Sequence, residues 1–117
     1  MAFIENLNQW TGKDVLGADG EKIGRLADTY YDAETDIAQF LVVETGALRK
    51  HLVLVPAGGA TGSPDHLTVP IDKDTVSKAP TIVAGDLTLE EEQRAFEHYG
   101  FEYSAASTPG GRRLVRH

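Results

Sequence analysis

The fold is decided by residues 14–56, DVLGADGEKIGRLADTYYDAETDIAQFLVVETGALRKHLVLVP. This stretch alternates runs rich in Val, Ile, Leu and Tyr with short segments rich in Gly, Asp and Thr, which is the pattern of strands joined by tight turns. The connections are too short for the crossover that parallel neighbours need. The sequence therefore predicts an antiparallel meander.

Residues 37–44, IAQFLVVE, are the most apolar run of the meander and predict its central strand. In a strand, successive side chains point to opposite faces. The apolar residues thus divide into Phe40 and Val42 on one face and Ile37, Leu41 and Val43 on the other. Because both faces are apolar, we expect this strand to be covered on both sides.

Residues 21–32 also predict a strand, but Ile23, Leu26 and Tyr30 cannot all share one face of a regular strand. A glycine within a strand often marks a bulge that shifts the register by one residue. We therefore place a bulge at Gly24. The interpretation has Leu26 and Tyr30 pointing the same way, with Asp28 between them.

The other segments are shorter. Residues 3–10 predict a helical turn that covers the core with Trp10. The remaining expectations are a flexible loop over 57–65, a strand over 66–71, one helical turn over 72–78 and a short strand over 81–83. The composition of residues 104–117 is typical of a disordered tail.

A C-terminal helix is predicted over residues 88–99, since Thr88 and Glu91 have the spacing of a capping box. Its narrow apolar stripe leaves an aromatic set that is hard to bury, consisting of Phe96, Tyr99, Phe101 and Tyr103. Packing within the chain is the favoured interpretation of this set. Docking against a second subunit is the alternative, which makes these four residues the candidate protein interface.

At 117 residues the chain fits one domain, predicted over residues 1–103 with a barrel core at about 10–83. The net charge of -7 repels phosphate backbones, so we expect no direct binding of nucleic acid. No run of 18 apolar residues occurs and no secretory signal is recognisable, so we expect a cytoplasmic protein without membrane insertion.

No catalytic constellation is recognisable. The four histidines lack metal-ligand spacing, and no serine lies in a nucleophile motif, so we predict no metal, no cofactor and no enzymatic activity. The carboxylate pairs Asp28 with Asp32 and Glu34 with Asp36 are more simply solvated or turn-forming. An enzymatic interpretation would place a small-molecule site near Asp28 and His51.

In order along the chain, Asp19-Gly20, Ile23-Gly24, Asp28, Asp32 and Val55-Pro56 form a pattern that resembles the signature of the PRC-barrel family. The acidic helix that ends in His98-Tyr99-Gly100 is similar to that of stand-alone bacterial members related to the H subunit of photosynthetic reaction centres. The resemblance implies a mainly β fold, a small, partly open antiparallel β-barrel. It also implies a protein-interaction or assembly module without catalytic residues.

Two functional hypotheses follow. The first is a non-enzymatic adaptor, a homodimer that binds a protein partner. The alternative is an assembly factor associated with ribosomes or RNA processing that acts through protein contacts. The alternative is suggested by the resemblance, since the family includes the C-terminal domain of the maturation factor of the small ribosomal subunit.

Overall fold

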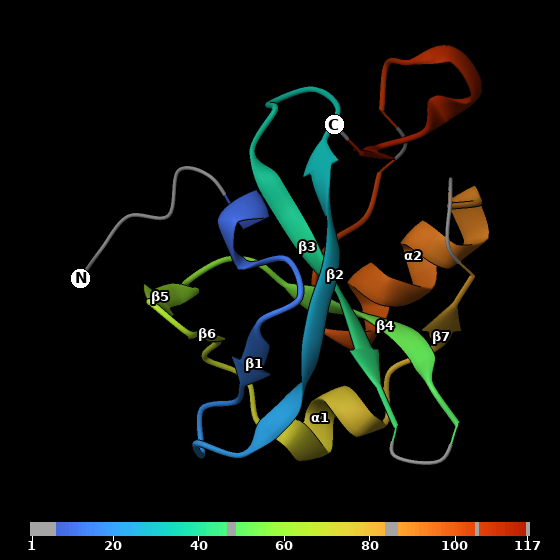
Figure 1. The fold of residues 1–117 in the computed structure, drawn as a ribbon. Coiled ribbons are helices and arrows are strands. Elements are labelled where there is room, and N and C mark those ends of the chain that lie inside the picture. Colours follow the sequence, from blue (N-terminus) through green and yellow to red (C-terminus); the bar gives the residue numbers. More distant parts are fainter. Residues whose placement is uncertain (1–6, 47–48, 84–86, 105, 117) are drawn as a thin grey trace.

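The computed structural model describes residues 7–46, 49–83, 87–104 and 106–116, and its ribbon is shown in Figure 1. The elements in chain order are η1 (Leu7–Trp10), β1 (Asp14–Leu16), β2 (Lys22–Asp32), β3 (Ala38–Thr45), β4 (His51–Pro56), β5 (Thr61–Ser63), β6 (His66–Thr68), α1 (Lys73–Ser77), β7 (Thr81–Ile82), α2 (Leu89–His98), η2 (Pro109–Gly111) and β8 (Leu114–Val115).

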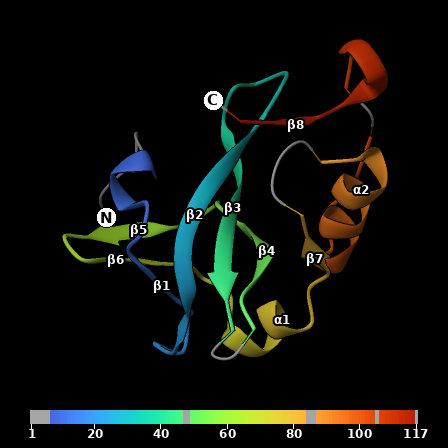
Figure 2. The ribbon, with the colours of Figure 1, turned by 45° about the vertical axis from the view of Figure 1, so that its right-hand side comes forward.

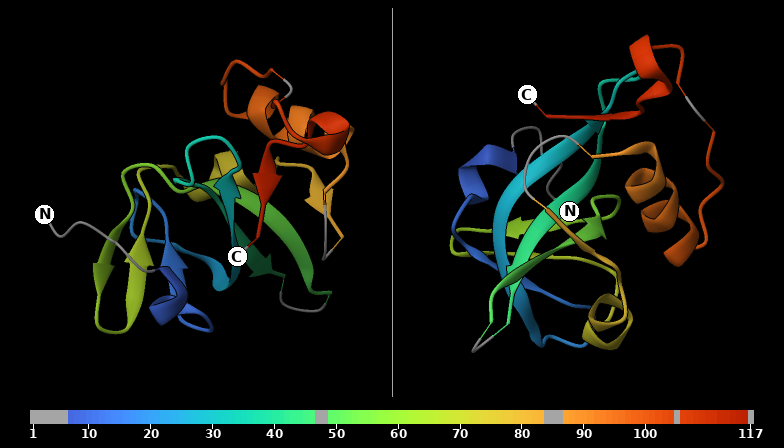
Figure 3. Two further views of the ribbon diagram at one scale, coloured as in Figure 1. Left: turned by 90° about the horizontal axis from the view of Figure 1, so that it is seen from above. Right: turned by 90° about the vertical axis from the view of Figure 1, so that its right-hand side faces the viewer.

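The strands form one sheet in the order β5-β6-β1-β2-β3-β4-β7, with β8 paired to β2. The pair of β1 and β6 is parallel and the other pairs are antiparallel. Figure 3 shows β5 and β6 on one side of the molecule and β7 with α2 on the other. The antiparallel meander of β2, β3 and β4 and the partly open, mainly β architecture are confirmed.

Two groups of buried side chains lie on opposite faces of β3. The aliphatic cluster contains Leu7, Val15, Ile23, Leu26, Leu41, Val43, Val53, Val55, Leu67, Val69 and Val76. The aromatic cluster contains Tyr30, Phe40, Val42, Leu54, Leu87, Ala95, Phe96 and Leu114. Both faces of β3 are thus covered, as its sequence predicts. Ile37 was wrongly assigned to this strand: it lies in the preceding turn and is 66% exposed.

The pairing of β2 shifts register in three places, and the extra residue lies in β2 in two of them and in β3, at Gln39, in the third. The shifts change which side chains share a face. Against β1 the extra residue is Ile23, and against β3 it is Ala27. Leu26 therefore lies in the aliphatic cluster and Tyr30 in the aromatic cluster. The prediction that Leu26 and Tyr30 point the same way was wrong, because the register shifts between them.

Gly24 has a steric role in addition to its place beside the first bulge. A Cβ atom on Gly24 would lie 2.2 Å from the carbonyl oxygen of Glu44 and 2.8 Å from Cγ1 of Val43. Real Cβ atoms do not approach other heavy atoms so closely. The close approach of β3 to β2 at this point therefore requires glycine.

The segment 57–65 contains β5, which pairs with β6, so the prediction of a flexible loop was wrong there. Trp10 explains the order of this hairpin, because its Nε1 donates a hydrogen bond to the carbonyl of Ser63 at 2.7 Å. The indole also lies over Gly62 and packs against the aliphatic cluster, as expected of Trp10. Residues 3–6 of the predicted helical turn lie outside the described residues.

The helix caps agree with the sequence. The side chain of Asp72 accepts from the backbone N–H of Thr75 at the start of α1. Thr88 and Glu91 form the reciprocal capping box that begins α2. After α2, Gly100 has a φ of +75°, a left-handed conformation that glycine tolerates at helix ends.

The segment 104–117 differs from the expectation of a disordered tail. Its described residues include η2 and β8, and Figure 2 shows β8 beside the end of β2. Leu114 pairs with Asp32 and is 1% exposed within the aromatic cluster. The physical reason is burial of one apolar side chain among partners from α2 and β2, which a polar, glycine-rich composition does not reveal.

Candidate functional site

The four aromatic residues predicted as an interface surround the inner face of α2. Phe96 is 5% exposed, and its ring centroid lies 5.3 Å from that of Phe40 in an edge-to-face arrangement. The hydroxyl of Tyr99 donates to the carbonyl of Leu54 at 2.6 Å. Three of the four, Phe96, Tyr99 and Tyr103, pack against or within the aromatic cluster. The remaining one, Phe101, is 40% exposed.

Both tyrosine hydroxyls of this set are held as donors. Burial raises the pKa of Tyr99 above its ordinary value. Burial, together with the hydrogen bond to Glu92, raises the pKa of Tyr103 to about 12. The two hydroxyls therefore stay protonated at neutral pH and act as fixed hydrogen-bond donors within the chain.

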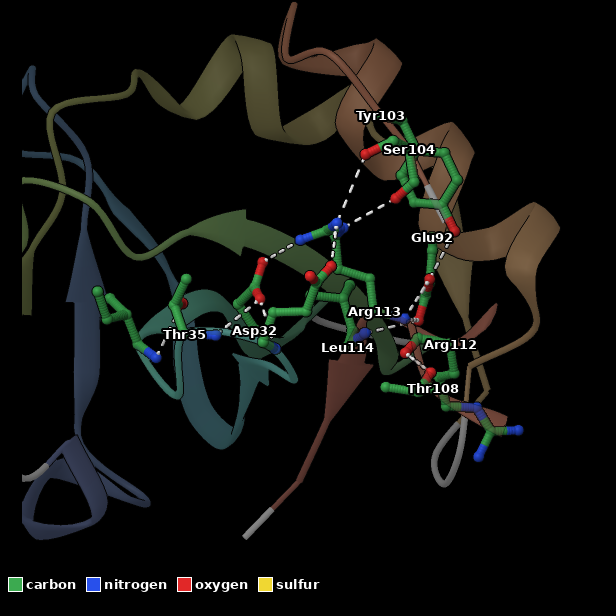
Figure 4. A network of polar contacts seen from close by, with 11 residues as sticks. Asp32, Thr35, Glu92, Tyr103, Ser104, Thr108, Arg112, Arg113 and Leu114 are labelled. Carbon is green, nitrogen blue, oxygen red and sulfur yellow. Dashed lines mark hydrogen bonds and ion pairs between the residues drawn. The ribbon is translucent and has the colours of Figure 1, made fainter. Parts of the chain in front are cut away.

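Glu92 is the centre of a polar network beside these rings (Figure 4). Its side chain is fully buried. Its carboxylate accepts from the hydroxyl of Tyr103 at 2.7 Å, from the backbone N–H of Leu114 at 2.7 Å and from the backbone N–H of Arg113 at 3.1 Å. A buried carboxylate is costly unless it is hydrogen-bonded, and this one joins α2 to the start of β8.

Arg113 extends the network to the end of β2. Its guanidinium donates to Asp32 at 2.8 Å, to Glu34 at 2.7 Å and to the carbonyl of Ser104 at 2.8 Å. Burial alone would raise the pKa of Asp32, but hydrogen bonds from Arg113 and from the backbone N–H groups of Glu34 and Thr35 lower it below its ordinary value. The carboxylates are thus committed to internal partners, and the network has a structural role.

One signal for Glu92 is present in the sequence. Glu92, Ala95, Phe96 and Tyr99 follow the i, i+3, i+4, i+7 spacing of one helix face. A carboxylate within the apolar stripe of a helix will be buried, and a buried carboxylate needs a hydrogen-bond donor as its partner. Nothing local identifies that partner as Arg113.

Three of the carboxylates in the predicted pairs have structural partners as well. Asp28 accepts from the backbone N–H of Thr29 and pairs with Arg116 at 3.2 Å, whereas Asp32 and Glu34 share Arg113. His51 contacts the carbonyl of Arg49 through its Nδ1 at 3.3 Å. Neither Asp28 nor His51 lines the two cavities described next.

A basic cleft lies at the end of the sheet where β2 begins, β3 ends and β4 begins, next to α1 (Figure 1). Its volume is about 580 Å³. The lining consists of Lys22, Ile23, Gly24, Arg25, Glu44, Thr45, Gly46, Lys50 and Lys73. The pattern of the sequence does not reveal this cleft, because its cationic residues belong to three separate segments. A second cavity, of about 10 Å³, lies between β7 and α2 and has room for little more than a water molecule.

Within residues 7–46, 49–83, 87–104 and 106–116, no group of three or more His, Cys, Asp or Glu residues is arranged to hold a metal ion. None of the helices in those ranges has the length and apolarity needed to cross a membrane.

A comparison with models of protein families matches the PRC-barrel domain to residues 4–76. The chain belongs to the PRC-barrel family. The PRC-barrel match contains every member of the aliphatic cluster, and β7, α2 and β8 lie beyond it. In a comparison with curated proteins, none matches the chain. The resemblance expected from the sequence over about 10–83 is therefore confirmed for the barrel.

Proposed function

We propose that this PRC-barrel protein is a non-enzymatic interaction module that forms a homodimer and acts as an adaptor for a protein partner. The observation that carries the proposal is an open sheet edge flanked by exposed apolar side chains. We call this surface the α2–β7 face and define it by Val83, Leu89 and Phe101.

The α2–β7 face combines two features of interaction surfaces. β7 pairs with β4 and ends the order of strands, so its outer edge presents backbone groups that another chain can pair with. Beside it, Val83 is 79% exposed, Leu89 is 42% exposed and Phe101 is 40% exposed.

Two members of this face, Val83 and Phe101, follow elements that touch, and the third, Leu89, is the first residue of α2. Ile82 of β7 and Tyr99 at the end of α2 line the same small cavity, so the strand and the helix end are adjacent. The ring of Phe101 lies 6.4 Å from that of Tyr99 between centroids. Among the described residues the other large exposed apolar side chain, Ile37, lies in the turn between β2 and β3. Three of the four large exposed apolar side chains among the described residues thus belong to α2 and the segments that flank it, and such a concentration is typical of a contact surface.

Sedimentation velocity at micromolar concentration tests the homodimer. We expect the wild-type protein to sediment as a dimer and Phe101→Ser to shift it toward the monomer, because the substitution removes apolar area from the α2–β7 face.

Ile37→Ser is the matched control, since Ile37 is also exposed but lies outside this face. Ile37→Ser should keep the melting temperature of the wild type, whereas Phe101→Ser should lower it slightly, because the ring of Phe101 also lies 6.3 Å from that of Phe40. Circular dichroism should show both variants folded. A monomeric wild type, or an equal loss of dimer in the two variants, would contradict the assignment of the face.

A further inference from the structure

We propose that the basic cleft binds an acidic segment of a protein partner, a short run of Asp and Glu side chains. This inference rests on the proposed function in one respect, namely that the protein acts by contacting other proteins. It adds the location of a second contact and the chemistry of what binds there.

The charge of the cleft is opposite to that of the molecule. Its lining holds four cationic side chains, Lys22, Arg25, Lys50 and Lys73, and one carboxylate, Glu44. The lining therefore carries a charge of +3, whereas the whole chain carries -7, so the remaining residues amount to -10. A concave region of one sign raises the local concentration of ligands of the opposite sign.

Internal ion pairs do not neutralise the cleft. Lys22 and Arg25 share a single carboxylate, that of Asp14, at 3.2 Å and 3.9 Å. Lys50 lies 3.6 Å from Glu44. Lys73 forms no ion pair within the described part of the chain. Four cations thus face two carboxylates, which leaves positive charge for a ligand.

The shape of the cleft suits a segment of chain more than a single small anion. Its volume of about 580 Å³ falls within the range of ligand pockets, about 300–1,000 Å³. Two of the lining residues, Gly24 and Gly46, have no side chain to fill this space. The lining cations are accessible from solvent, with side-chain exposure of 51% for Lys22 and 68% for Lys50.

The charge outside the cleft favours an acidic peptide over a nucleic acid. An extended phosphate backbone would run beyond the cleft along a molecule whose remaining residues sum to a charge of -10, and repulsion acts within about 8 Å at physiological salt. A short acidic run can end at the rims. Three of the four cations are lysines, whose point charges pair with separate carboxylates, as Lys22 and Lys50 already do with Asp14 and Glu44.

Fluorescence anisotropy with a labelled octaglutamate peptide tests the inference. We expect the wild-type protein to bind the peptide and the binding to weaken as salt rises from about 25 to about 150 mM. The double variant Lys50→Glu with Lys73→Glu should lose at least tenfold in affinity, because it reverses half of the cationic lining.

The double variant Lys78→Glu with Arg94→Glu is the matched control. It makes the same change in net charge at exposed cations outside the cleft, and it should keep the affinity within about twofold. Circular dichroism should show both variants folded, since all four side chains are exposed or lie on rims.

Three results would overturn the inference: no binding by the wild type at low salt, equal weakening in the two double variants, or equal binding of an oligonucleotide of the same charge. A competition experiment in which inorganic phosphate alone saturates the cleft would also overturn the inference, because the ligand would then be a small anion and not a peptide. A dimer that depends on Phe101 but does not bind the peptide would reject this inference and leave the proposed function standing.

Discussion

The aliphatic and aromatic clusters lie on the two faces of one sheet, yet they are built in different ways. The aliphatic cluster contains only Val, Leu and Ile among its buried members, and all of them lie within the family match. The aromatic cluster takes half of its members from beyond the match: Leu87, Ala95, Phe96 and Leu114. It is closed by the network of Glu92 and Arg113.

A small barrel can thus gain a second core in a different way from its first. Apolar packing alone is enough where short hairpins bring the strands together. On the other face, α2 and β8 come from distant positions, and buried hydrogen bonds fix where they dock. Buried polar groups tolerate few alternative arrangements, because each unsatisfied group is costly. The aromatic cluster should therefore depend on polar partners in a way that the aliphatic cluster does not.

The largest expected effect lies at the aliphatic cluster. Gly24→Ala adds one methyl group, whose carbon would lie 2.2 Å from the carbonyl oxygen of Glu44. We expect a loss of more than about 3 kcal/mol in the free energy of unfolding, measured by urea denaturation. Gly58→Ala, where a Cβ meets nothing within 4 Å, should change it by less than about 0.5 kcal/mol. Similar values for the two variants would show that β3 can move away from β2.

At the aromatic cluster, Glu92→Ala should cost about 3 kcal/mol, because it leaves buried donors at Tyr103, Arg113 and Leu114 without an acceptor. The exposed neighbour Glu90 provides the comparison, and Glu90→Ala should cost less than about 0.5 kcal/mol. Urea denaturation at neutral pH measures both. A small effect at Glu92 would mean that polar partners do not hold this cluster together.

A smaller effect should appear in β8. Leu114→Ala removes a side chain that is 1% exposed and should cost about 2 kcal/mol. Val115 is partly exposed, so Val115→Ala should lower the free energy of unfolding by less than about 1 kcal/mol. Thermal unfolding of the two variants distinguishes an anchored strand from the disordered tail expected from composition, which would give no change at either position.

The smallest expected effect depends on pH. The lowered pKa of Asp32 means that its contribution to stability is fully present above the unfolded pKa of about 3.8 and is lost as pH falls through the still lower folded value. Asp32→Asn should therefore be less stable than the wild type by about 1 kcal/mol at pH 7. This difference should shrink below pH 4 in urea denaturation. A difference that stays constant down to pH 2 would mean that the charge of Asp32 is not what stabilises the fold.

How much the sequence could predict depended on the range of each interaction. The capping box of Thr88 and Glu91 and the two faces of β3 are set by spacings of a few residues, so they could be predicted. The residue pattern that begins with the Asp19-Gly20 turn also consists of short spacings, so the resemblance to the PRC-barrel family could be recognised from the sequence. Ile23, Leu26 and Tyr30 showed that β2 is irregular, but the second bulge at Ala27 was not visible in the pattern.

The rest depended on distant partners. The hydrogen bond between Arg113 and Asp32 joins residues 81 positions apart, and neither residue is unusual in its own neighbourhood. Trp10 orders β5 across 53 positions through Ser63. The basic cleft likewise collects cations from positions 22 to 73. Residues 57–65 and 104–117 have the composition of loops, and composition carries no information about contacts between residues so far apart in the sequence.

The pairing of β8 with β2 also has a kinetic consequence. The contact between Asp32 and Arg113 closes a loop of 81 residues, which carries a high entropic cost. We therefore expect it to form after the local hairpins of the meander. Interactions that form late affect the unfolding rate more than the folding rate. Leu114→Ala should then leave refolding nearly unchanged and accelerate unfolding, which stopped-flow measurements can resolve. During synthesis, the face of the sheet that carries Phe40 would stay uncovered until α2 has been made, and its cluster would be complete only with Leu114.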